Sequence, residues 1–162
     1  FFFQAEDGIR YLVRSRGLGD VCKRQEQDLY DRFDNPAKVK LIQVLEKQGH
    51  QVTNVKENYF ADVETTKKGI VYYSEGEVKR AWSEEWPDDW AEIRIPHRKE
   101  RLLKKYDSNV NFYVFNVHLT QCWMIRGQQM TEETVRTAKG RYIQKGELFY
   151  HIPYKEAELI RL

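Results

Sequence analysis

The sequence predicts an α+β fold in which helices flank a central mixed sheet. Segments with helical periodicity and short runs of β-forming residues follow one another as a helix, three strands, a basic helix and two strands. With 162 residues, of which 41% are hydrophobic and 14% aromatic, the chain is too rich in large apolar side chains to be disordered. Its longest apolar runs, such as 112–115, are far shorter than the roughly 20 residues of a membrane span. We expect a cytoplasmic protein with no membrane association.

The first 25 residues fit none of these patterns. Their FFFQAEDGIR and RSRGLGDV blocks resemble translated sequencing-adaptor read-through, which is found at the ends of some metagenomic gene sequences. We interpret residues 1–25 as a leader foreign to the protein and residues 26–162 as a single domain; a genuine amphipathic leader is the alternative. The leader holds five of the 27 basic and three of the 25 acidic side chains, so 22 of each remain. Overall charge therefore gives no argument for nucleic-acid binding.

The elements are expected in the following order. A helix begins at Pro36, capped by Asp34 or Asn35, and ends at Gly49. Residues 97–106 form a basic helix, residues 82–96 a loop with one helical turn, and residues 131–139 fit no single class. Strands are expected at 50–56, 59–66, 70–80, 111–117, 121–125 and 147–154, the last being the final strand.

The strand at 70–80 carries the residues with the clearest chemical signal. Because side chains alternate along a strand, its odd positions share one face, which begins apolar and ends with two carboxylates and an ammonium. Those positions are Val71, Tyr73, Glu75, Glu77 and Lys79. The preceding strand offers Asp62 in an apolar setting, and a buried aspartate needs a partner. A divalent cation held by Asp62 and Glu77 would supply one.

Two alternatives to this site remain open. The charged residues can form a solvated cross-strand ladder on a surface hairpin, and Glu75 can lie outside the metal ligands. The second concerns the pairing register of the hairpin, because a tight turn at Lys67–Lys68 would place Asp62 opposite Tyr73 and not opposite Glu77. To bring Asp62 to Glu77, the hairpin needs a longer connection, a shifted register or a bulge at Gly76.

An aspartate followed about 15 residues later by Glu-x-Lys on the next strand resembles the PD-(D/E)xK nuclease superfamily. The residues of the pattern are Asp62, Glu77, Val78 and Lys79, and the likeness extends over residues 36–126. Ala61 stands where the family usually has proline. The resemblance implies a restriction-endonuclease-like sheet and hydrolysis of nucleic-acid phosphodiesters with Mg²⁺ or Mn²⁺.

The resemblance also assigns roles to individual residues. Asp62, Glu77 and the Val78 carbonyl would bind the metal, and Lys79 would act on the attacking water and the phosphate. The basic helix would contact backbone phosphate. Its cationic side chains are Arg98, Lys99, Arg101, Lys104 and Lys105.

We expect DNA, and not RNA, as the substrate. The sequence does not decide between a monomer and a homodimer. The rival hypothesis is a catalytically inactive nucleic-acid-binding or protein-binding module on the same fold. Close approach of Asp62, Glu77 and Lys79 would favour the enzyme, whereas a Lys79 side chain turned away would favour the module.

Overall fold

A computed structural model describes residues 35–55 and 61–162. The chain divides between Pro36 and Ala37 into two units, of which the second is Ala37–Leu162. The interpretation of residues 1–25 as a foreign leader and the proposed cap Asp34 lie outside the described residues.

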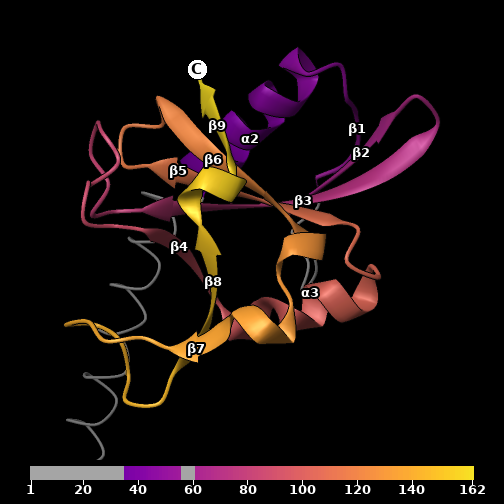
Figure 1. Cartoon of the computed structure of the whole chain (residues 1–162). Coiled ribbons are helices and arrows are strands. Elements are labelled where there is room, and N and C mark those ends of the chain that lie inside the picture. Colours follow the sequence, from indigo (N-terminus) through magenta and orange to yellow (C-terminus); the bar gives the residue numbers. More distant parts are fainter. Residues whose placement is uncertain (1–34, 56–60) are drawn as a thin grey trace, which may run out of the picture. The chain divides into compact units, whose positions relative to one another are not determined.

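The fold is α+β, as the sequence predicts, and its centre is a mixed six-stranded sheet (Figure 1). Its strands, in spatial order, are β1 (Gln51–Asn54), β2 (Val63–Lys67), β3 (Ile70–Lys79), β5 (Val110–Asn116), β6 (Gln121–Arg126) and β9 (Glu158–Arg161). Neighbouring strands are antiparallel except β3 and β5, which are parallel. A second, antiparallel sheet has the order β4 (Glu92–Pro96), β8 (Leu148–Pro153) and β7 (Val135–Thr137).

The described helices are α2 (Asn35–Lys47) and α3 (Glu100–Lys105). Gly49, at φ 85°, follows α2, and the His50 amide donates to the Leu45 carbonyl at 3.0 Å, as expected for a helix that ends at a left-handed glycine. Within the described residues, four 3₁₀ turns complete the elements: η2 (His97–Lys99), η3 (Gly127–Gln129), η4 (Glu132–Thr134) and η5 (Tyr154–Glu156).

Each face of the central sheet has its own core. On one face, α2 packs through Leu41 and Leu45 against Val63 and Phe115. The other face is covered by α3 and the second sheet, with residues such as Leu102. In Figure 1, α2 and α3 accordingly lie on opposite sides of the six-stranded sheet. Because β3 and β5 are parallel, the chain must cross over this second face between them, and β4, η2 and α3 lie in that connection.

The structure corrects the predicted elements at two places. Strand β4 lies within residues 82–96, where the sequence predicts a loop, and β9 follows the segment 147–154 that is expected to hold the final strand. Both strands are short, with five and four residues. Strand β9 has only one half-buried residue and no alternating pattern, whereas β4 does alternate, with Ile93 and Ile95 buried, over too few residues to outweigh the tryptophans and prolines around it. The basic helix also begins as a 3₁₀ turn, so its α-helical part is only 100–105.

Candidate functional site

The position of Asp62 follows from the turn between β2 and β3. Lys67 pairs with Ile70, so the turn is the two-residue loop Lys68–Gly69, and both loop residues have positive φ, 51° and 76°. That geometry is typical of a type I′ hairpin, whose twist suits antiparallel strands. The register continues to Val63 opposite Ser74. One residue further on, Asp62 lies beside Glu75, and not opposite Tyr73 as a turn at Lys67–Lys68 would require.

Hydrogen bonds tie Asp62 to the strand that it faces. The Asp62 amide donates to Glu75 Oε2 at 3.2 Å, and the Gly76 amide donates to Asp62 Oδ2 at 2.9 Å. Gly76 also leaves room for Leu41 beneath the sheet, because a Cβ there would lie 3.3 Å from Leu41 Cδ2. Asp62 and Glu75 are therefore neighbours at the beginning of β2, each carboxylate accepting from a backbone amide of the other strand.

Glu75 is the most deeply buried carboxylate of this group, with 6% of its surface exposed. Burial, and next the negative charge of Asp62, raise the pKa of Glu75, while the nearby Lys99 and Arg101 act in the opposite direction. Lys99 Nζ contacts Glu75 Oε1 directly, and the Lys99 side chain is itself only 15% exposed. A buried carboxylate with an acidic neighbour and a cation at contact distance is the combination often found at functional sites.

Glu77 and Lys79 continue along the same face of β3. Lys79 Nζ lies 5.2 Å from the centre of the Trp90 ring, within reach of a cation–π interaction. Burial lowers the pKa of Lys79, and the charge of Arg94 lowers it further, whereas Glu77 opposes the shift. A cavity of about 250 Å³ lies beside the ammonium. Its lining residues are Lys79, Asp89, Trp90, Ala91, Glu92 and Arg94.

The structure therefore places Asp62, Glu77 and Lys79 on one face of the sheet, but it sets Glu75 between Asp62 and Glu77. Val78 points to the other face, where its side chain packs against the α2 core, so it can offer only its backbone to this site. Lys79 turns toward Trp90 and its cavity.

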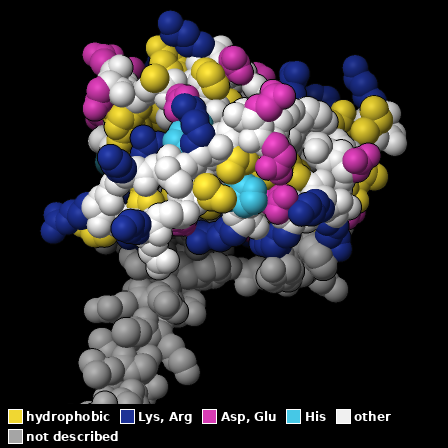
Figure 2. All heavy atoms as spheres, turned by 60° about the horizontal axis from the view of Figure 1, so that its bottom comes forward, with side chains coloured by type: hydrophobic (Ala, Val, Ile, Leu, Met, Phe, Trp, Pro, Cys, Tyr) yellow, Lys and Arg dark blue, Asp and Glu magenta, His cyan; other side chains and the backbone are white. Residues whose placement is uncertain are grey.

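The expected nucleic-acid contacts of the basic helix separate into two groups. Lys99 and Arg101 are half-buried and act on Glu75, whereas the other three are exposed. Lys104 is 72% exposed and forms an ion pair with Glu100 at 2.9 Å. On the face seen in Figure 2, Lys and Arg side chains gather along the margin of the described part, and acidic side chains lie between them.

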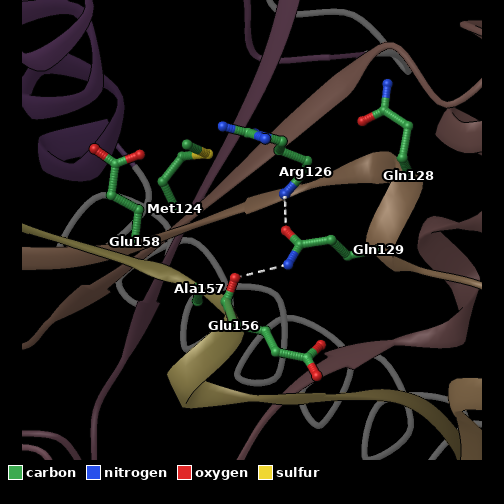
Figure 3. Close-up of a pocket in the computed structure, with 7 residues that line it drawn as sticks. All are labelled: Met124, Arg126, Gln128, Gln129, Glu156, Ala157 and Glu158. Atoms are coloured by element: carbon green, nitrogen blue, oxygen red, sulfur yellow. Dashed lines mark hydrogen bonds between the residues drawn. The ribbon is translucent and has the colours of Figure 1, made fainter.

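A further cavity of about 450 Å³ opens where β9 separates from β6 (Figure 3). Here the Gln129 side chain lies between two backbone groups that are not hydrogen-bonded to each other directly. It accepts from the Arg126 amide at 2.8 Å and donates to the Glu156 carbonyl at 2.8 Å. No residue of the charged face lines this cavity. We regard Gln129 as a structural bridge between the two strands.

No family model matches the chain, and no curated protein is significantly similar to it. Within the described ranges, no helix is long and apolar enough to cross a membrane.

Sequence reasoning did not assign Glu75 and Trp90 to the site, and it gave Lys99 a different role. A signal for Glu75 was present, because glycine at the second position of a two-residue loop suits a type I′ turn, and counting from Lys68–Gly69 pairs Asp62 with Glu75. No local sequence signal predicts that Lys99 and Trp90 lie at this site, because both belong to the crossover connection between β3 and β5.

Proposed function

We propose that this chain is a nuclease that hydrolyses nucleic-acid phosphodiesters with Mg²⁺ or Mn²⁺, and that Asp62 and Glu75 are its principal metal ligands. The observation that carries the proposal is that Asp62 and the buried Glu75 are neighbours, close enough for the charge of Asp62 to act on Glu75, on a strand face that also carries Glu77 and Lys79. Mg²⁺ is commonly held by one or two carboxylates, waters and substrate phosphate oxygens. Burial raises the pKa of Glu75 most, and a cation here would relieve the repulsion from Asp62 that raises it further.

The lysines have distinct roles in this proposal. When bound, the metal would supply Lewis-acid polarisation of the phosphate. Lys99, in contact with Glu75, would hold that carboxylate in place, while Lys79 lies further along β3 beside an open cavity. Its lowered pKa suits a group that donates a hydrogen bond or a proton near a developing negative charge. Arg98 and Lys105, both exposed, would contact the phosphate backbone.

The likeness to the PD-(D/E)xK pattern then takes a modified form. The aspartate remains Asp62, the glutamate becomes Glu75, and Glu77 stands at the position of the family's lysine. An ammonium group would be supplied by Lys99 or Lys79. The mixed sheet, with a helical crossover between parallel strands β3 and β5, is compatible with this interpretation.

A binding module without catalysis is the second candidate, and the Glu75–Lys99 ion pair favours it. An ion pair already neutralises the buried carboxylate, so the charges on this face can be stable without a metal. In that case the exposed cations would bind nucleic acid and the carboxylates would have a structural role.

Nicking of supercoiled plasmid DNA in Mg²⁺, Mn²⁺ and Ca²⁺ tests the proposal, with single-stranded RNA as the second substrate. Asp62→Asn and Glu75→Gln should each abolish cleavage. Glu46→Gln, which changes an exposed carboxylate on α2, should leave it intact. The melting temperature of the wild type should rise with Mg²⁺, and this rise should be lost in both site variants.

Full cleavage by purified Asp62→Asn would refute the metal assignment. DNA binding in Ca²⁺ without cleavage in Mg²⁺ or Mn²⁺, and with no metal effect on the melting temperature, would replace the enzyme with the binding module.

A further inference from the structure

A second group of ligand-type side chains lies away from the face of Asp62 and Glu75. It consists of His97 in η2, Glu100 at the beginning of α3 and Glu132 in η4. One nitrogen or oxygen atom of each residue lies within 4.8 Å of the other two. His97 and Glu100 are three residues apart in one continuous helical stretch, so they project from the same side, and Glu132 comes from the segment after β6.

Tyr150 packs against this cluster. Its ring is 1% exposed and stacks on His97, with ring centres 5.2 Å apart and an angle of 28° between the planes. Burial raises the pKa of Tyr150 to about 12, and the negative charges of Glu100 and Glu132 contribute to this rise. Both carboxylates are therefore close enough to act on one buried phenol.

The charges at this group are only partly balanced. Lys104 forms an ion pair with Glu100, but its side chain is 72% exposed, and an exposed pair of this spacing contributes little to stability. A metal ion can displace this weakly held cation from Glu100.

We propose that His97, Glu100 and Glu132 form a binding site for a divalent transition-metal ion of the Zn²⁺ type. Imidazole nitrogen and carboxylate oxygen are ordinary Zn²⁺ ligands at about 2.0–2.2 Å, and in a tetrahedral site two such ligand atoms lie about 3.3–3.6 Å apart. Atoms already within 4.8 Å of one another can reach that spacing by side-chain rotation. The imidazole favours Zn²⁺ over Mg²⁺, whose preferred ligands are all oxygens.

Such a site would link two segments that are distant in the sequence. It would fasten η2, which contains Lys99, and the beginning of α3 to η4 and the start of β7. The bound ion would therefore fix the backbone that positions the Lys99 ammonium beside Glu75. The inference rests on the geometry of this cluster and holds whether or not the chain is a nuclease.

Competition for Zn²⁺ against a chromogenic chelator tests the site, with the visible spectrum of bound Co²⁺ as a second measurement. All variants carry Cys22→Ser, because that thiol is also a zinc ligand by chemistry. Glu132→Gln should weaken Zn²⁺ binding at least tenfold and change the Co²⁺ bands. Glu133→Gln, the matched control at the adjacent exposed carboxylate, should leave both unchanged.

Asp62→Asn should also leave this Zn²⁺ binding unchanged, which separates the cluster from the proposed nuclease site. Equal Zn²⁺ affinity in the wild type, Glu132→Gln and Glu133→Gln would overturn the inference. So would the absence of Zn²⁺ binding tighter than millimolar in the wild type.

Discussion

Replacing Lys99 by methionine removes the cation that contacts the buried Glu75 carboxylate while keeping a side chain of similar length. The Glu75 and Lys99 side chains are 7% and 15% exposed, so this is a largely buried pair. Breaking such a pair by removing one partner typically costs about 3–5 kcal/mol. Arg101 still acts on Glu75, so we expect the lower end, about 3 kcal/mol at pH 7.5.

The loss should depend on pH, with a sign that the environment of Glu75 fixes. Burial and Asp62 hold the pKa of Glu75 above its ordinary value, and Lys99 opposes this shift, so Lys99→Met should raise it further. A carboxyl whose pKa is raised by folding keeps its proton longer in the folded state. Stability therefore falls as the pH rises from the unfolded value, near 4.5, through the folded value. Protonated Glu75 needs no cation, so the cost of Lys99→Met should shrink toward pH 5.

Urea unfolding at pH 5.0 and pH 7.5 measures this difference. Lys104→Met is the matched control, because it removes another lysine of the same helix from an exposed pair with Glu100. It should cost about 0.3–0.5 kcal/mol at both pH values. The reasoning would be refuted by a Lys99→Met loss that is the same at pH 5.0 and 7.5, or by an equal loss in Lys104→Met.

Three substitutions test the packing that supports the site, each measured by urea unfolding. Gly127→Ala should cost about 3 kcal/mol, since its Cβ would lie 2.5 Å from the Ser108 carbonyl oxygen and 2.7 Å from that of Val110. Asn116→Ala should cost about 2–3 kcal/mol, because the fully buried amide accepts from two backbone amides and donates to Thr120 in the β5–β6 turn. Gln129→Ala should cost about 1 kcal/mol, since water can replace its bridge.

The sequence predicts well the elements whose residues bury a patterned face. The helix that ends at Gly49 and the strand at 70–80 agree with α2 and β3 within one or two residues. Strand β9 was not predictable in the same way, because its four residues show no alternation and it is held mainly by pairing with the distant strand β6. Strand β4 does carry a short alternating pattern, with Ile93 and Ile95 buried, but it spans only five residues and its partner β8 is distant in the sequence.

The register of the β2–β3 hairpin shows how a small error in a turn changes the chemistry of a site. Moving the two-residue loop by one position, from Lys67–Lys68 to Lys68–Gly69, moves the partner of Asp62 by two residues, from Tyr73 to Glu75. The side chains stay on the same face, so the hydrophobic pattern does not distinguish the two registers. Only the conformational preference of Gly69 for positive φ does.

The rest of the candidate site is a consequence of topology. Two parallel neighbouring strands require a connection that passes over the sheet, and here that connection covers the face on which Glu75, Glu77 and Lys79 project. The crossover delivers Lys99 to Glu75 and Trp90 to Lys79, two contacts that join residues 11 or more positions apart. From composition alone, the basic segment that contains Lys99 suggests a surface for phosphate. Once the crossover is known, at least one cation of this basic segment must point toward the sheet, because a carboxylate as buried as Glu75 is costly without a cation beside it. For the same reason, replacing Lys99 should lower the free energy of unfolding, whereas replacing the exposed Lys104 should change it little.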